Sequence, residues 1–124
     1  MLILVAHGSR DARWRASVER VVASLQVPAV RETVRLAYMD LTPPTLLDVA
    51  REAFRCGEKD LRVLPLFLAA EGHVERDVKP LVDAVRAALE GVEITLLEPI
   101  GQQAEFREAL ARIADRPERE RTAP

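Results

Sequence analysis

The hydrophobic positions of the chain alternate between two periods, one typical of strands and one typical of helices. Short apolar runs predict strands that are covered on both faces, at residues 2–5, 33–41, 61–70 and 92–97. Apolar residues at helical spacing predict amphipathic helices over residues 14–25, 45–54, 78–89 and 106–113. Strands that alternate with single helices pair in parallel through right-handed crossovers. The pattern therefore predicts an α/β fold with three layers, in which helices cover both faces of an open, four-stranded parallel sheet.

The pattern changes at Pro65 and near the end of the chain. Pro65 lies inside the third predicted strand and has no amide proton for the ladder, so we expect a bulge or a locally unpaired position there. From Asp115 onwards the residues are mostly charged and show no apolar stripe. We therefore expect residues 1–114 to form a single α/β domain and residues 115–124 to be a disordered, charged tail.

Composition narrows the class of protein further. The chain has 124 residues, of which 48% are hydrophobic and 31% are charged, as in a soluble globular domain. Its formal net charge of -2 argues against a nucleic-acid partner. The single cysteine, Cys56, cannot form an internal disulfide, and we expect a reducing, cytoplasmic environment. The apolar residues 1–6 are too few for a signal or membrane segment.

Reactive side chains collect where the predicted strands end. Ligands of open parallel sheets bind outside the carboxyl ends of the strands. The side chains that follow the four strands are, in order, His7, Ser9 and Arg10; Asp40; Glu71 and His73; and Glu98. Both histidines of the chain therefore belong to one edge of the sheet, and carboxylates accompany them.

Two histidines with carboxylates suit the binding of cobalt, nickel, iron or zinc, and imidazole also exchanges protons near neutral pH. His7 and His73 are far apart in the sequence, so only the fold can bring them together. Structural roles stay open for the same residues. Either histidine could be a hydrogen-bonded structural residue, Ser9 and Asp11 could cap the first helix, and Glu71 could be a solvated loop acid. Basic side chains at this edge could be ordinary surface charges, namely Arg10, Arg13 and Arg76.

Three segments of the chain resemble a known family. LILVAHGSRD, AYMDLTPPTL and VLPLFLAAEGHVERDV (residues 2–11, 37–46 and 63–78) are similar to the small sirohydrochlorin chelatases, the short cobalt- or iron-inserting members of the class II chelatases. The similarity runs in order from Leu2 to about Ile113. It implies one half of a class II chelatase fold, and a homodimer with a tetrapyrrole cleft between the subunits.

The resemblance also implies an activity. Such enzymes insert a divalent metal, here cobalt, iron or nickel, into the carboxylate-rich tetrapyrrole sirohydrochlorin during cobalamin or sirohaem biosynthesis, without ATP or another cofactor. His7 and His73 match the two histidines that hold the metal and accept pyrrole protons. Asp40 stands where many relatives carry a glutamate, and Glu71 is an additional candidate ligand or proton acceptor.

The substrate would need further contacts from the chain. Ser9, Arg10, Arg13 and Arg76 are candidates for binding its carboxylates, together with the N-termini of neighbouring helices. Leu41, Phe67 and Leu68 are candidate apolar walls for the faces of the macrocycle.

Three alternatives stay open. The segment LVAHGSR resembles the strand-end RHG of histidine phosphatases, but Ala6 stands where that chemistry needs an arginine. A metal-binding or metal-delivery protein without catalysis could use the same two histidines. It would bind cobalt or nickel but would neither bind nor metallate sirohydrochlorin. A structural domain with hydrogen-bonded histidines is the third alternative.

Overall fold

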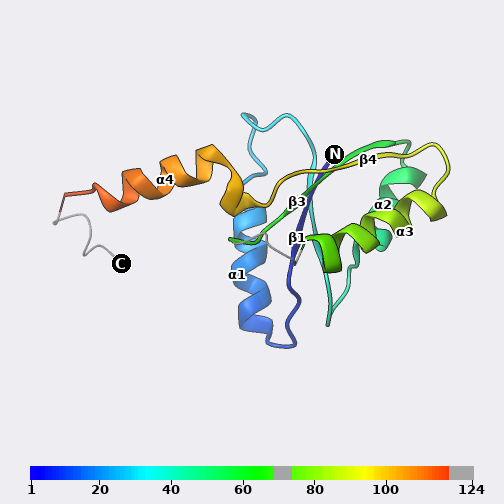
Figure 1. The fold of residues 1–124 in the computed structure, drawn as a ribbon, viewed down its shortest axis with the longest axis horizontal. Helices are drawn as coiled ribbons and strands as arrows, with labels where there is room; N and C mark the ends of the chain where they lie inside the picture. The colour runs from blue at the N-terminus through cyan, green and yellow to red at the C-terminus, as the bar shows by residue number, and fades with distance from the viewer. Residues whose placement is uncertain (69–73, 118–124) are drawn as a thin grey trace.

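The computed structural model describes residues 1–68 and 74–117 and contains one parallel sheet with four helices (Figure 1). Its strands are β1 (Leu2–Ala6), β2 (Val34–Tyr38), β3 (Asp60–Pro65) and β4 (Glu93–Leu96). Its α-helices are α1 (Ala12–Ala23), α2 (Leu46–Arg55), α3 (Lys79–Ala88) and α4 (Ala104–Ala114). A π-helical turn, η1 (Val74–Val78), precedes α3, and a 3-10 turn, η2 (Ile100–Gln102), precedes α4. The predicted fold class and order of elements are confirmed.

The sheet has the strand order β2-β1-β3-β4, and all of its pairs are parallel. β1 is therefore an inner strand, with Leu4 in register with Leu36 of β2 on one side and Leu64 of β3 on the other. An inner strand of a sheet with helices on both faces needs apolar residues in both directions. Ile3, Leu4 and Val5 meet this requirement, because all three are buried.

Pro65 is accommodated at the end of β3 without a bulge. The amides of Arg62 and Leu66 donate to the carbonyls of Met1 and Val5 in β1, at 2.9 and 2.8 Å. Because hydrogen-bonding directions alternate along a strand, the nitrogen of Pro65 faces β4. Pairing with β4 ends earlier, at Val63 and Leu96. Of the two expected arrangements, a bulge or an unpaired position, the structure has the unpaired position, because the nitrogen of Pro65 lies beyond the end of the pairing with β4.

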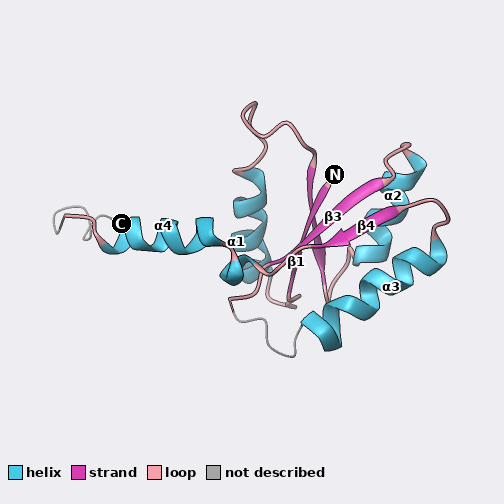
Figure 2. Cartoon of the chain, turned by 45° about the horizontal axis from the view of Figure 1, so that its top comes forward, coloured by secondary structure: helices cyan, strands magenta, loops and turns pink. Residues whose placement is uncertain are grey.

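Helices α2 and α3 cover one face of the sheet and enclose the main core (Figure 2). This core includes Ile3 and Val5 of β1, Leu46 and Val49 of α2, and Val82 of α3, which are all essentially inaccessible to water. Burying a side chain of this size stabilises the fold by about 1.5–3 kcal/mol. The face under α2 and α3 therefore supplies most of the apolar burial in the described residues.

Helix α1 lies on the opposite face, next to β2. Its N-cap is Asp11, whose carboxylate accepts the amide of Arg13 at 2.9 Å, so the structural role proposed for Asp11 is confirmed. The hydroxyl of Tyr38 donates to Glu19 of α1 at 3.4 Å, and burial, reinforced by the charge of Glu19, raises the pKa of Tyr38. No residue of α1 is fully buried, and Trp14 and Val21 are exposed. The apolar stripe predicted for this helix exists but is only partly covered.

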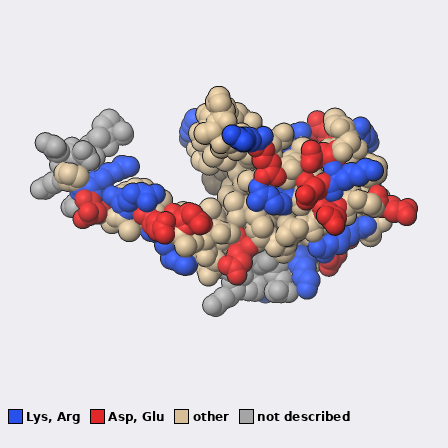
Figure 3. Space-filling model, turned by 90° about the horizontal axis from the view of Figure 1, so that it is seen from above, with Lys and Arg blue, Asp and Glu red and all other residues tan. Residues whose placement is uncertain are grey.

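Helix α4 extends away from the sheet as an arm (Figures 1 and 2). None of its residues is buried, and its main contacts are to η2. Basic and acidic side chains are interspersed along the arm and over the rest of the face seen in Figure 3. The predicted tail, residues 115–124, begins directly after α4 ends at Ala114 and mostly lies outside the described residues, so its disorder stays a prediction. Within residues 1–68 and 74–117, no helix is long and apolar enough to cross a membrane.

The start of α2 is held by a reciprocal cap. The Thr45 hydroxyl accepts the amide of Asp48 at 3.1 Å, and the Asp48 carboxylate accepts the amide of Thr45 at 2.9 Å. These bonds lower the pKa of Asp48. The contribution of Asp48 to stability is therefore present above the pKa of the unfolded chain and is lost as the pH falls through the lowered value. The cap also fixes the end of the loop that leads from β2 to α2.

We expect Thr45→Ala to lower the free energy of unfolding by about 1 kcal/mol at neutral pH, because an amide of the first turn loses its acceptor. Urea denaturation measures this difference. Thr33→Ala, at an exposed position before β2, is the control and should change stability by less than about 0.5 kcal/mol. Equal effects of the two substitutions would contradict a stabilising role for the cap.

Candidate functional site

The carboxyl edge of the sheet brings together the ends of β1, β2 and β3. His7 follows β1, Asp40 follows β2, and Phe67 follows β3. Because β1 lies between its two partners, His7 is placed between the loops that carry Asp40 and Phe67. The side chains of His7 and Asp40 are each 46% exposed, so both are anchored in the fold yet open to solvent.

Asp40 links the first two loops. One carboxylate oxygen, Oδ1, accepts the backbone amide of Gly8 at 2.8 Å. The other oxygen, Oδ2, lies 3.9 Å from Nδ1 of His7. This distance is too long for a hydrogen bond, so the interaction is electrostatic. A carboxylate beside Nδ1 favours the tautomer that carries its proton there, in which Nε2 is the nitrogen with the lone pair.

Phe67 supports the histidine ring from the other side. The centroids of the Phe67 and His7 rings are 4.8 Å apart, with an interplanar angle of 43°. Phe67 is only 7% exposed and belongs to the main core. It therefore acts as a fixed apolar support for the imidazole, and it is not available as a wall for a large ligand. The sequence identified Phe67 as apolar but could not show this orientation.

Two glycines allow the loops at this edge to cross in direct contact. A β-carbon at Gly8 would overlap the backbone carbonyl of Asp40, and one at Gly101 would overlap the backbone carbonyl of Leu68. The amide of Gly101 also donates to the carbonyl of Phe67 at 3.0 Å. Only glycine lets the backbones approach so closely. The loops after β2 and β3 are therefore each fixed against a neighbouring loop.

The loop after β1 is organised mainly by its own polar groups. The Ser9 hydroxyl accepts the amide of Asp11 at 3.0 Å, and the guanidinium of Arg13 pairs with the Asp11 carboxylate at 3.3 Å. The pKa of Asp11 is lowered, chiefly by its hydrogen bonds with Arg13. Ser9 and Arg13 thus have local structural partners here. Arg15, which the sequence analysis missed, donates to the carbonyl of Ser9 at 2.7 Å and holds the loop against α1.

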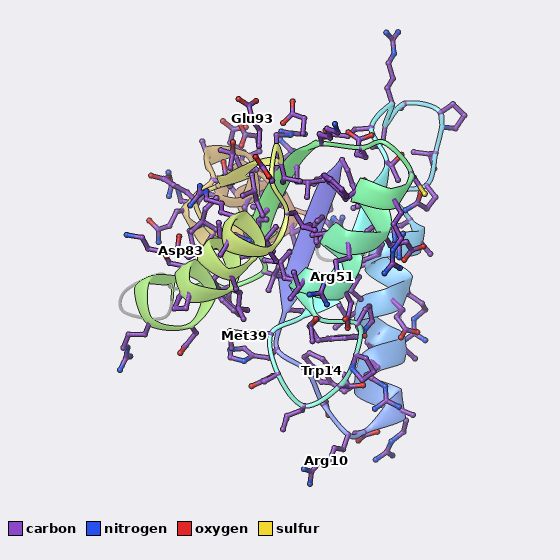
Figure 4. The ribbon with its side chains drawn as sticks, turned by 90° about the vertical axis from the view of Figure 1, so that its right-hand side faces the viewer. Arg10, Trp14, Met39, Arg51, Asp83 and Glu93 are labelled. Atoms are coloured by element: carbon purple, nitrogen blue, oxygen red, sulfur yellow. The ribbon has the colours of Figure 1, made fainter. Side chains whose placement is uncertain are left out.

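The remaining basic candidates are exposed. Arg10 lies at the tip of the loop after β1 and points away from the sheet (Figure 4). Arg76 is exposed in η1, the turn that leads into α3. Glu71 and His73 lie outside the described residues, so their proposed roles stay predictions. Within residues 1–68 and 74–117, no three His, Cys, Asp or Glu side chains converge on one point that could hold a metal ion.

The opposite edge of the sheet contrasts with this arrangement. Its charged groups neutralise one another in a cluster formed by Glu32, Arg62 and the amino group of Met1. The guanidinium of Arg62 is the main cause of the lowered pKa of Glu32. These ion pairs are those of an ordinary protein surface. The carboxyl edge is therefore the better candidate for chemistry, as the sequence predicts.

Comparison with known proteins assigns the chain to a family. A protein-family model named CbiX matches residues 1–116. The chain belongs to the CbiX family. This assignment confirms the resemblance carried by the three sequence segments, each of which leads into the carboxyl edge.

Relatives of this CbiX-family chain include enzymes and solved structures. A sirohydrochlorin cobaltochelatase from Methanopyrus kandleri is 32% identical over 81 residues, which cover 65% of this chain and 57% of that protein. A crystal structure described as a cobalamin (vitamin B12) biosynthesis CbiX protein, from Marinobacter aquaeolei VT8, matches with a TM-score of 0.82, 36% identity and 98% coverage of both chains. The sirohydrochlorin chelatase SirB from Bacillus subtilis subspecies spizizenii, in complex with cobalt, has the same fold, with a TM-score of 0.77 and 20% identity. This chain covers 48% of the SirB chain.

We expect Gly8→Ala to disturb the site of this CbiX-family chain, because the new methyl group would push the loop after β1 away from Asp40. The free energy of unfolding should fall by about 1–3 kcal/mol, as for other overpacked positions. The Co²⁺ binding that the sequence predicts at this edge, measured by calorimetric titration, should weaken as well.

Gly57→Ala is the matched control for this substitution. Gly57 adopts a positive φ, of 84°, whereas Gly8 does not; a β-carbon at Gly57 meets no atom within 4 Å, and the residue precedes β3 at the opposite edge. It should lose stability through backbone strain and keep its Co²⁺ affinity. Unchanged Co²⁺ affinity in Gly8→Ala would show that the crossing of the loops does not determine the site.

Proposed function

We propose that this chain is a chelatase that inserts a divalent metal, cobalt or iron, into sirohydrochlorin. The observation that carries the proposal is the geometry of His7, which is half exposed at the exit of an inner strand and fixed between Asp40 and Phe67. Chelatase names among the relatives support this choice of reaction. The matched region covers 57% of the first of these relatives, so activity and substrate are proposed here for the chain.

Metal insertion needs a binding site that is weak enough to give up its metal. A closed site with four protein ligands would retain the ion. A neutral imidazole on a half-exposed side chain provides one exchangeable ligand. In the proposed mechanism His73 provides the second, and water or the Glu71 carboxylate completes the coordination. The incoming metal is a substrate of the reaction, and no ATP or other cofactor is required.

Two pyrrole protons must leave the macrocycle when the metal enters it. Once the ion has moved from His7 to the pyrrole nitrogens, Nε2 of His7 has a free lone pair. It can then accept a proton, with the Asp40 carboxylate 3.9 Å from Nδ1 of the same ring. His73 or Glu71 accepts the other proton. A positioned general base contributes about 10²–10⁴-fold to such a rate.

The acidic periphery of the substrate needs basic partners. Arg10 and Arg76 are exposed and are the proposed partners of its carboxylates. Ser9 and Arg13 bind Asp11 and remain candidates beside them. With a net charge of -2 on the chain, this attraction has to be local.

The cobaltochelatase names of the relatives favour cobalt and cobalamin biosynthesis over iron and sirohaem biosynthesis. The exposed free thiol of Cys56 supports a cytoplasmic location.

We further propose that the active form is a homodimer in which α4 packs against the second copy. Phe106, Leu110 and Ile113 form one face of α4, and the last two are each 50% exposed. Within the same chain, Leu64 and Leu66 of the β3 region are only partly covered on the sheet face opposite α2 and α3. Two copies could cover both surfaces reciprocally. The SirB chain, which is about twice as long, offers the space for two such units in one polypeptide.

The central prediction concerns the histidines. His7→Ala should reduce cobalt insertion into sirohydrochlorin at least 100-fold, because both a metal ligand and a proton acceptor are lost. His73→Ala should have a similar effect. The reaction is followed anaerobically through the absorption of the macrocycle with Co²⁺, Fe²⁺ or Ni²⁺, against a mixture without protein. The circular dichroism of both variants should stay unchanged. Wild-type protein that binds Co²⁺ but accelerates insertion of none of the metals would instead support the metal-carrier alternative.

Asp40→Ala should have a smaller effect, because Asp40 acts through His7 and Gly8. A supporting residue of this kind typically contributes about 10–100-fold to metal affinity or activity. Calorimetric titration with Co²⁺ and the insertion assay measure the two quantities. Asp83→Ala, which removes an exposed carboxylate of α3 paired with Arg86, is the control and should leave both unchanged. Full activity in Asp40→Ala would rule out the proposed support of His7.

Substitutions in α4 test the proposed homodimer. The double substitution Leu110→Asp with Ile113→Asp should convert the dimer to a monomer in analytical ultracentrifugation, because charges would enter an apolar contact. Glu108→Lys, on the opposite face of the same helix, should leave the mass unchanged. A wild-type chain that sediments as a monomer at all concentrations would refute the proposed assembly.

A further inference from the structure

Leu41 and Leu68 are the most exposed large apolar side chains among the described residues. Leu41 is 62% exposed and Leu68 is 69% exposed. Leu41 directly follows Asp40, and Leu68 directly follows Phe67. These two neighbours are the residues that flank His7. The two leucines thus lie on the loops on either side of the histidine, because β1 lies between β2 and β3.

The backbone around Leu41 is strained and closed. Leu41 has a φ of 64°, and it is the one residue other than glycine with a positive φ in the described part of the chain. A bond of 2.7 Å from the amide of Thr42 to the carbonyl of Asp40 closes a three-residue turn around it. The same carbonyl rests against Gly8. A leucine held in this conformation is unfavourable for the folded state by itself, and such strain collects at ligand sites.

Leu68 is held in a comparable way on the other side. Its carbonyl rests against Gly101, and the amide of Gly101 donates to the preceding residue, Phe67, at 3.0 Å. The exposure of the two leucines therefore does not result from a loosely held backbone. Both loops are fixed by backbone contacts, and both carry an exposed apolar side chain next to a residue that flanks His7.

We infer that Leu41 and Leu68 form a two-sided apolar clamp that contacts the tetrapyrrole and positions its ring over His7. This inference rests on the proposed function and adds a specificity-determining subsite to it. A flat macrocycle with an apolar interior and carboxylates at its periphery matches two leucines separated by an imidazole, with basic side chains farther out. Phe67 has no part in this contact, because it is buried under His7.

The test uses Leu41→Asn and Leu68→Asn in the full-length chain. Asparagine is close in size to leucine, is polar, and tolerates a positive φ. Binding of metal-free sirohydrochlorin is measured by fluorescence titration, and KM and kcat are measured for cobalt insertion. Each variant should bind the tetrapyrrole about tenfold more weakly and show a matching rise in KM, because one apolar contact is lost. The kcat and the affinity for Co²⁺ alone should stay close to those of the wild type.

Two control variants accompany them. Leu41→Met keeps an apolar side chain of similar volume and should retain tetrapyrrole affinity. Val27→Asn changes an exposed apolar residue in the loop between α1 and β2, at the opposite edge, and should have no effect. Thermal unfolding shows that each variant is folded, and we expect no loss of stability in Leu41→Asn.

The remaining outcomes separate this inference from the proposed function. Unchanged tetrapyrrole affinity in both asparagine variants, with normal insertion by the wild type, would overturn the clamp and leave the chelatase proposal intact. A shift from dimer to monomer in these variants would assign the leucines to the contact between copies and would also overturn the clamp. A wild type that does not bind sirohydrochlorin at all would refute both.

Discussion

The parallel pairing of β1 with β2 and β3 is the constraint on which the rest of the molecule depends. It makes β1 an inner strand, which has to be apolar on both faces, and Ile3, Leu4 and Val5 are buried accordingly. Parallel pairing also aligns the carboxyl ends of the three strands. The residue that leaves β1 is therefore placed between the loops of its two neighbours. In this chain that residue is His7, and the loops supply Asp40 and Phe67.

Backbone contacts at this edge allow exposed side chains to be well positioned. Asp40 receives the amide of Gly8, and the carbonyls of Asp40 and Leu68 rest on two glycines. Loops usually gain mobility from exposure. Here the crossings restrain the backbone while the side chains of His7 and Leu41 stay in contact with water. The proposed chelatase activity needs this combination, since metal and macrocycle must both enter and leave a site that keeps its geometry.

The helices cover the two faces of the sheet to different extents. Under α2 and α3 the core is closed, whereas α1 covers only part of the other face and α4 extends away from it. The turn before α4 is attached to the loop after β3 through Gly101 and Phe67, which fixes where the helix begins. An isolated chain therefore leaves apolar surface uncovered on both α4 and the sheet. This incomplete burial is the feature of the single chain on which the proposed homodimer depends. The turn that directs α4 also supports the loop that carries Leu68.

Local patterns in the sequence determined the elements and their order. Short apolar runs predicted the strands, and apolar residues at helical spacing predicted the helices. Asp11 was recognisable as a possible cap, and the parallel topology placed His7 and Asp40 at one edge. Only the tertiary structure decided how these elements meet. It ended β3 at Pro65 where pairing with β4 has already stopped, tied Arg15 to the loop of Ser9, placed Phe67 beneath the imidazole, and directed α4 away from its own sheet. The physical reason is that periodicity reflects contacts between residues close in the chain. The orientation of Phe67 or α4 depends instead on contacts between distant segments, which exist only once the sheet has formed.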